Sequence, residues 1–239
     1  FRGSAKIVQL FEMLSGARLT YNYISIGGVY KDIPGEFKDK FLEFYNEFPK
    51  RLNEIQNLFM ENEIFLQRMQ GIGYLSPEKA MSYSITGPVL RASGVKYDIR
   101  KNFPYLYYDK VDFDIPTSKD GDNFARFVVR IEEMRQSLKI TKQAFDKMPE
   151  GEYFNPLYRK QGLIKIKGKG ESYSRTESPR GEFGVYVVGD GTSKPYRVRI
   201  RSPAFHALSA TNDMVKGSKI ADMIATLSTL DPVFGEVDR

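Results

Sequence analysis

The sequence predicts a mainly α fold with a small β element, that is, an α+β fold. In two long stretches, apolar residues recur every three or four positions, which is the period of an amphipathic helix. One pair of short alternating segments is joined by a glycine turn, which indicates a β-hairpin. Apolar residues make up 41% of the 239 positions, enough for a core, and we expect residues 1–239 to form a single domain.

Composition excludes several kinds of site. The chain has no cysteine, so it can form no disulfide and can hold no iron–sulfur cluster or zinc ion through thiolates. Its one histidine, His206, rules out a histidine-rich metal site, and we expect a structural or surface role for it. We therefore expect no metal on this chain. The net charge of +6 comes from bases interleaved with acids, which indicates a mixed solvated surface rather than a nucleic-acid binder.

The first 70 residues are predicted to be mostly helical. Residues 5–14 form a helix that Ser15-Gly16 ends, and glycines followed by Pro34 mark a loop. Residues 37–69 form one or two long amphipathic helices, which Pro49 divides or kinks. The apolar stripe of these helices consists of Phe37, Phe41, Phe44, Phe48, Leu52, Ile55 and Phe59.

The middle of the chain combines helix signals with one long irregular stretch. Ser76 and Pro77 supply an N-cap and a first helical residue. Residues 86–116 show no clean period and predict a long loop, which in a compact chain is usually functional or bound to a partner. Asp122 is expected to cap the next helix, whose apolar stripe is typical of a buried helix–helix seam. That stripe consists of Ile131, Met134, Leu138, Thr141, Phe145 and Met148.

The last third contains the expected β element. Residues 151–180 predict a loose, basic segment, and residues 182–188 and 196–201 predict the two strands of a hairpin. A helix over 217–231 then leads into the tail DPVFGEVDR, 231–239. Alternation places three arginines on one face of the second strand, where they are either solvated or paired with carboxylates. These are Arg197, Arg199 and Arg201.

The predicted loop carries the candidate charged site. Arg91 and Arg100 lie among glycines and tyrosines, with Asp98 between them. Because buried charges must be paired, such a network suits an interface with another protein or a proton-conducting wall, with a solvated surface loop as the alternative. No spacing elsewhere selects an acid/base pair, a phosphate-binding loop or a dinucleotide fold, so no catalytic residue is assigned.

Six motifs occur along the chain in a fixed order: TGPVLRASGVKYDIRKNFPY, YDKVDFDIP, VRIEEMRQSL, PRGEFGVYVVGDG, PYRVRIRSPAF and DPVFGEVDR. In this order they resemble the D subunit of NADH-quinone oxidoreductase, in the respiratory complex I family. The resemblance covers nearly the whole chain and implies that it corresponds to the C-terminal part of such a protein. It also implies the helical core of the [NiFe]-hydrogenase large-subunit-like family, from which the D subunit descends.

The resemblance relates the C-terminal tail to a metal-binding tail in hydrogenases. Hydrogenase large subunits end in DPCxxCxxH, whose cysteines and histidine hold nickel and iron. The former metal-ligand positions are here Val233, Glu236 and Arg239, and a valine cannot coordinate a metal. The resemblance implies that the vacated cavity receives the headgroup of a quinone, with Val233, Phe234 and Gly235 lining it. Arg91, Asp98 and Arg100 are candidates for a charged network behind the cavity.

The implied function is that of a peripheral-arm component of a proton-pumping NADH-quinone oxidoreductase at the cytoplasmic face of the cell membrane, or its mitochondrial-matrix equivalent. Quinone is the implied substrate, and a [4Fe–4S] cluster is carried by a neighbouring protein of the complex. The implied partners are the iron–sulfur B and I subunits, the C subunit and the membrane-embedded H subunit. The proton donors to quinone, a His and a Tyr of the family, are expected in the preceding part of the protein.

Two alternatives stay open. The chain could be a scaffold component of the same kind of complex that takes no part in the chemistry. It could also be a ferredoxin-linked relative of the membrane-bound hydrogenase lineage, because Thr20 and Ser25 stand where many family members have a histidine and an arginine. A nickel enzyme is opposed by the absence of cysteine.

Overall fold

The computed structural model describes residues 2–156 and 167–238, and it divides into two compact units. The first unit is built from the described parts of Phe1–Asn57 and Phe145–Ile166, and the second from those of Leu58–Ala144 and Lys167–Arg239. The expectation of a single domain stays a prediction. Among the described residues, no helix is both long enough and apolar enough to cross a membrane.

The first unit holds helix α1 (Arg2–Ser15), the short strands β1 (Ile24–Ser25) and β2 (Gly28–Val29), and most of α2 (Phe37–Met60). Helix α1 was predicted, and it ends where Gly16 takes a positive φ of 77° and donates its N–H to the carbonyl of Glu12. Lys6 of α1 pairs with Glu43 and Glu47 of α2. These ion pairs join the two helices of the unit.

Pro49 was predicted to divide or kink the long helix, and the division is wrong, whereas the kink stays a prediction. Helix α2 runs through Pro49 without interruption and ends at Met60. Asn62 then caps the next helix, α3 (Glu63–Met69), by accepting the N–H of Phe65. A proline costs a helix about 3 kcal/mol. Buried side chains on both sides of it, among them Phe41 and Leu52, hold the helix together by packing.

The predicted loop 86–116 is also wrong in part, because the second unit folds it into short helices. They are α5 (Gly87–Ala92), α6 (Ile99–Asn102) and a 3₁₀ turn η1 (Tyr108–Lys110). Like Pro77 of α4 (Pro77–Ser82), Pro88 stands in the first turn of its helix, where its missing N–H costs nothing. Helices of four to six residues are too short to show a hydrophobic period in the sequence.

Helix α7 (Asn123–Asp146) begins as predicted, since the carboxylate of Asp122 accepts the N–H of Ala125 at 2.7 Å. The predicted apolar seam along it is wrong in part, because Ile131 is buried and Phe145 packs against Phe41, but other members of the stripe are exposed. Met134 and Met148 are exposed, whereas Asn123 and Arg126 are fully buried. Asn123 and Arg126 belong to a polar network, described below, that lies N-terminal to the predicted stripe.

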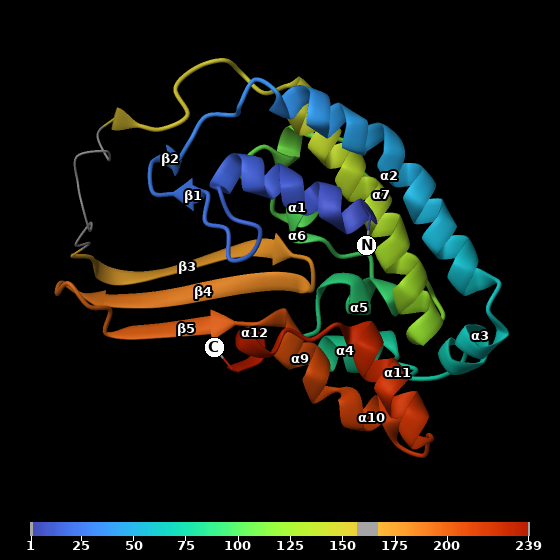
Figure 1. Ribbon diagram of the computed structural model, residues 1–239. Coiled ribbons are helices and arrows are strands. Elements are labelled where there is room, and N and C mark those ends of the chain that lie inside the picture. The colour runs from blue at the N-terminus through green and yellow to red at the C-terminus, as the bar shows by residue number, and fades with distance from the viewer. Residues whose placement is uncertain (1, 157–166, 239) are drawn as a thin grey trace. The chain divides into compact units, whose positions relative to one another are not determined.

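The sheet of the second unit has three antiparallel strands in the order β3 (Lys169–Ser178), β4 (Gly181–Asp190) and β5 (Arg197–Arg201), with β4 in the middle (Figure 1). The predicted hairpin of β4 and β5 is confirmed. The prediction of a loose segment is wrong over β3. That strand is polar and largely exposed, so it lacks the alternation that marks a half-buried strand. The rest of that prediction falls partly on 157–166, outside the described residues.

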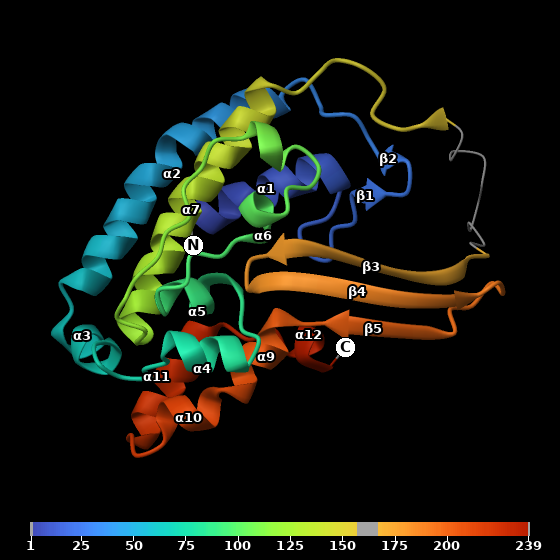
Figure 2. The ribbon, with the colours of Figure 1, turned by 180° about the vertical axis from the view of Figure 1, so that it is seen from behind.

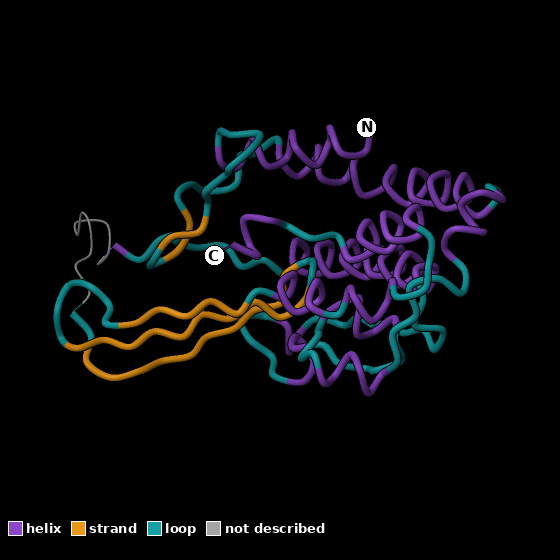
Figure 3. The backbone as a smooth tube through the Cα atoms, turned by 90° about the horizontal axis from the view of Figure 1, so that it is seen from below, coloured by secondary structure: helices purple, strands orange, loops and turns teal. Residues whose placement is uncertain are grey.

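Four helices follow the sheet: α9 (Pro203–Ser209), α10 (Thr211–Val215), α11 (Ile220–Leu230) and α12 (Phe234–Asp238). They gather with α4 and α5 at one end of the three strands, whose other ends extend away from these helices (Figures 2 and 3). The core of this end consists of Leu75, Ala80, Ile85, Val89, Leu90, Ala207, Ala210, Met214 and Leu230. In this core Leu230, the last residue of α11, joins Val89 and Leu90 of α5, which positions the start of the C-terminal tail.

Candidate functional site: a charged pocket and the C-terminal tail

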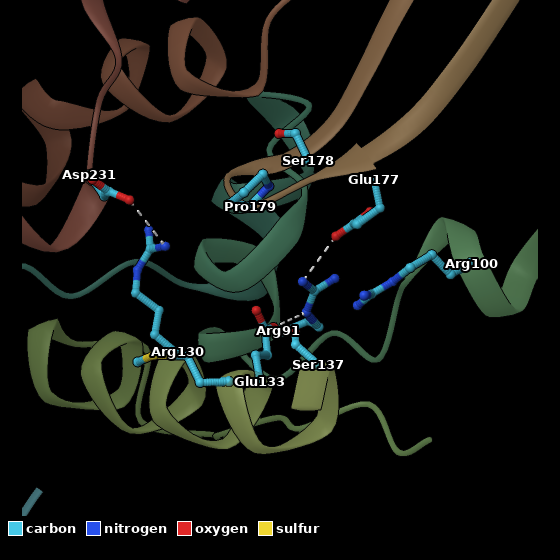
Figure 4. Close-up of a pocket in the computed structure, with 10 residues that line it drawn as sticks. Arg91, Arg100, Arg130, Glu133, Ser137, Glu177, Ser178, Pro179 and Asp231 are labelled. Atoms are coloured by element: carbon cyan, nitrogen blue, oxygen red, sulfur yellow. Dashed lines mark hydrogen bonds and ion pairs between the residues drawn. The ribbon is translucent and has the colours of Figure 1, made fainter. Parts of the chain in front are cut away.

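A pocket of about 400 Å³ lies within the second unit, and most of the residues that line it are charged. Figure 4 shows Arg91, Glu177 and Arg100 on one side of it and Arg130 with Asp231 on the other. Its lining comes from α5, α6, α7, β3 and the residue after α11. The lining residues are Arg91, Arg100, Arg130, Glu133, Met134, Ser137, Glu177, Ser178, Pro179 and Asp231.

Arg91 is the centre of the first charge cluster. It is 1% exposed, and its guanidinium donates to Glu133 of α7 at 2.5 Å and to Glu177 of β3 at 3.0 Å. A third carboxylate, Asp98, lies 3.6 Å from it. One guanidinium thus joins three elements that are distant in the sequence, and it satisfies charges that could not be buried singly.

Asp98 and Arg100 form a two-point ion pair beside Arg91. The guanidinium of Arg100 contacts the Asp98 carboxylate at 3.0 and 2.6 Å, and the N–H of Arg100 donates to the same group at 2.9 Å. Burial by itself would raise the pKa of Asp98, but the hydrogen bonds and charge of Arg100 outweigh it and lower that pKa. The structure therefore brings together the three residues Arg91, Asp98 and Arg100 that the sequence marked as a network.

Glu177 is the exception in this cluster. Burial raises its pKa to about 7, against the opposing charge of Arg91. Its side chain is nearly enclosed, and Arg91 is the cation with which it forms an ion pair. This carboxyl therefore changes charge near neutral pH, unlike Asp98.

The C-terminal tail begins with a clamped aspartate. Asp231 ends α11 in the left-handed conformation, at φ 53°. Arg180 donates to its carboxylate at 3.0 Å and to its carbonyl at 3.1 Å, and Arg130 lies 3.7 Å from the carboxylate. Arg130 also donates to the carbonyls of Thr229 and Leu230, the last turn of α11. Two arginines thus fix the direction in which the tail leaves the helix.

A second buried arginine, Arg126, lies near the N-terminus of α7. Arg126 is 0% exposed and donates to the carbonyls of Gly73 and Gly121 at 2.7 and 3.0 Å. It also donates to Asn123 at 2.5 Å and to Thr229 at 3.0 Å. Because its hydrogen bonds go to neutral acceptors, burial lowers its pKa to about 10. This network joins α7 to α11.

The predicted quinone-facing residues lie on the tail away from the lining of the pocket. Val233 is 38% exposed and Phe234, the first residue of α12, is 75% exposed. A Cβ at Gly235 would meet nothing within 4 Å. One carboxylate oxygen of Glu236, Oε1, is buried and has no hydrogen-bond partner in the described parts of the chain. The third former metal-ligand position, Arg239, lies outside the described residues.

Several site residues were missed by the sequence reasoning. Glu133 and Arg180 lie in motifs that carry the family resemblance, but no spacing links them to Arg91 or to Asp231. Glu177 lies in the segment that was expected to be loose. His206 contacts the carbonyl of Tyr83 at 3.1 Å, as a structural histidine does. In residues 2–156 and 167–238, no group of three or more His, Asp or Glu side chains could hold a metal ion.

Replacing Arg180 with alanine is expected to loosen the tail. Asp231 would keep only the longer contact to Arg130, and a hydrogen bond to a charged group contributes about 1.5–3 kcal/mol. Amide hydrogen exchange over residues 231–238 of the full-length chain should become faster by about tenfold or more. The matched control is Arg199→Ala on exposed β5. Unchanged exchange in the Arg180 variant would show that the clamp does not hold the tail.

The fold and the tail together define a class of protein. The chain is mainly α with a small β element, as predicted, and it has the hydrogenase large-subunit-like fold with a tail that contains no cysteine. It belongs to the family described as the 49 kDa subunit of the respiratory-chain NADH dehydrogenase, which it matches over residues 1–239. The resemblance drawn from the six motifs is thereby confirmed.

Curated relatives match the chain over its whole length. It is 49% identical to the D subunit of NADH-quinone oxidoreductase from Dehalococcoides mccartyi, and 46% identical to the first of the numbered D subunits from a Roseiflexus species. The D subunit from Clostridium beijerinckii is 42% identical. The chain covers 64%, 65% and 64% of the lengths of these relatives, so it spans just under two thirds of each.

Proposed function

We propose that the chain acts in a peripheral-arm component of a proton-pumping NADH-quinone oxidoreductase. In this proposal its tail forms part of the cavity in which quinone is reduced, beside an iron–sulfur cluster held by a neighbouring protein of the complex. The family match and the names of the relatives support the complex. The observation that carries the role of the tail is its geometry: exposed apolar side chains stand directly after an aspartate that two arginines clamp.

The chemistry of quinone reduction fits these groups. Reduction of a quinone to a quinol takes two electrons and two protons, and the headgroup needs an apolar slot with a few polar groups. Val233 and Phe234 offer apolar surface, and Glu236 adds a buried oxygen that lacks a partner in the described structure. The 239 residues contain no cysteine to hold a cluster, and in this proposal the electrons come from the cluster on the neighbouring protein.

A role in holding partner proteins is the second candidate, and one observation favours it. The apolar face of α11 points outward: Ile220 is 82% exposed and Ile224 is 61% exposed, while the polar Asp222 and Thr226 face inward. Contiguous exposed apolar surface marks a contact with another protein. The proposed neighbours are other components of the complex, at the cytoplasmic face of the membrane.

The test of the quinone role is Val233→Met in the assembled complex that contains the full-length protein. A longer side chain in a packed slot costs about 1–3 kcal/mol, so the KM for quinone should rise by about fivefold or more. The affinity of quinone-site inhibitors should change with it. The control is Val198→Met, an exposed valine on β5. An unchanged KM and unchanged inhibitor sensitivity in the Val233 variant would leave only the scaffold role.

A further inference from the structure

The charge cluster around Arg91 does not balance. It contains two guanidiniums, those of Arg91 and Arg100, and three carboxylates, those of Asp98, Glu133 and Glu177. With every group ionised its net charge is −1. The side chains of Arg91 and Asp98 are almost fully enclosed, and an unbalanced charge in such a place is costly. A single proton on one carboxylate makes the cluster neutral.

The contacts decide which carboxylate takes the proton. Asp98 is held ionised by the two-point contact with Arg100 and by a backbone N–H. Glu133 makes the shortest contact with Arg91, at 2.5 Å, and keeps more contact with solvent than Glu177 does. Glu177 has one contact with Arg91 at 3.0 Å and the more enclosed side chain. Its raised pKa, about 7, agrees with this ranking.

The surroundings of Glu177 are set by three other elements as well as by its own strand. Arg91 comes from α5, Arg100 from α6, and Glu133 from α7. The charged and titratable groups that face Glu177 or act on its ion pair are Arg91, Tyr97, Asp98, Arg100, Glu133, Tyr105, whose hydroxyl accepts the N–H of Glu177 at 2.9 Å, and, through Tyr97, Arg175 and Glu182.

The opposite wall of the pocket carries the complementary imbalance. There Arg130 and Asp231 line the pocket, and the Asp231 carboxylate also pairs with Arg180, so these two guanidiniums and one carboxylate have a net charge of +1. Arg130 also has a buried Nε–H without a partner in the described structure. The pocket thus separates a cluster that is one proton short of neutrality from a cluster with an excess positive charge, at the point where the tail begins (Figure 4).

We propose that Glu177 is a proton-binding site, which takes up and releases one proton through this pocket. The proposal deepens the proposed function and rests on it for its role in turnover: Glu177–COOH becomes Glu177–COO⁻, and the proton becomes one of the two that convert quinone to quinol. Release leaves −1 around Arg91, and the +1 cluster at Asp231 stabilises that charge across the pocket. Glu177 regains its proton from water in the pocket.

The test is Glu177→Gln in the assembled complex, with Glu171→Gln as the matched control. Glu171 lies on the same face of the same strand but is exposed. Infrared spectra recorded while the pH is raised should show a protonated-carboxyl band that disappears with a midpoint near pH 7. The Glu177 variant should lack this band, and the control should keep it. A band that persists in Glu177→Gln, or the absence of any such titration in the parent, would overturn the proposal.

Turnover supplies the second readout. At about pH 6, where Glu177 holds its proton, Glu177→Gln should reduce quinone about tenfold more slowly than the parent, and the difference should shrink above the midpoint. If the glutamine variant fails to assemble, Glu177→Asp keeps a carboxyl and should shift the infrared midpoint; an unchanged midpoint contradicts the proposal. The two proposals can fail separately. If the infrared titration is as expected but Val233→Met leaves the KM for quinone unchanged, the proton-binding site at Glu177 is retained and only the quinone role of the tail is contradicted.

Discussion

Replacing Arg91 with alanine is expected to destabilise the chain by about 3–5 kcal/mol, because removal of one partner leaves the other buried charges uncompensated. Three carboxylates surround this guanidinium, at 2.5, 3.0 and 3.6 Å. Denaturant unfolding of the full-length chain measures the loss. Arg199→Ala on the exposed face of β5 is the control, with an expected change within about 0.5 kcal/mol.

The loss of unfolding free energy caused by Arg91→Ala should depend on pH. Without the guanidinium, the raised folded-state pKa of Glu177 moves further above its value in the unfolded chain, and the lowered pKa of Asp98 moves upward. A carboxyl with a raised folded pKa contributes stability that is present below the unfolded pKa and is lost as the pH rises through the folded pKa. The variant should therefore be closer to the parent at about pH 4.5 than at about pH 8. A penalty that is small and independent of pH would contradict the buried cluster.

Replacing Gly73 with alanine is expected to be the second large effect. Gly73 has a φ of 67°, and a Cβ there would lie 2.5 Å from Asn123 Oδ1, 2.7 Å from Thr226 Oγ1 and 2.9 Å from Arg126 Nη2. The methyl group would force apart the polar network that joins α7 to α11. Positive φ alone costs a non-glycine residue about 1–2 kcal/mol, and crowding of a packed site adds about 1–3 kcal/mol.

Gly71 provides the control for this prediction. Its φ of 69° is nearly the same, but a Cβ there would meet nothing within 4 Å. Gly71→Ala therefore carries the conformational cost without the collision. Denaturant unfolding should show the greater loss for Gly73→Ala. If both variants lose the same free energy of unfolding, the Arg126 network accommodates the added methyl group at no cost in stability, which contradicts the prediction.

The sequence predicted the regular elements better than the irregular ones. The cap at Asp122, helix α1 and the hairpin of β4 and β5 follow local rules that the sequence displays. Strand β3 and the short helices α5 and α6 depend on their neighbours in the fold. A polar strand with one partner, or a helix of a single turn, leaves no hydrophobic period to detect.

The site divides in the same way. Arg91, Asp98 and Arg100 could be marked because they lie within ten residues of one another in a stretch rich in turns. Glu133 and Glu177 reach Arg91 only through the fold, from 42 and 86 residues away. The Arg126 network lies at the start of α7, before the predicted apolar stripe begins at Ile131. No local sequence pattern indicates that a buried arginine will donate its hydrogen bonds to carbonyls and hydroxyls rather than to carboxylates.

The most direct test of the central claim, that the tail forms part of a quinone cavity, is photolabelling. A photoreactive quinone analogue is bound to the assembled complex, and the labelled peptides of the full-length protein are mapped. Label is expected within residues 231–238; excess quinone should suppress it, and Arg180→Ala should weaken it because that variant loosens the tail. Label confined to other segments, or label in the tail that quinone does not displace, would contradict the claim.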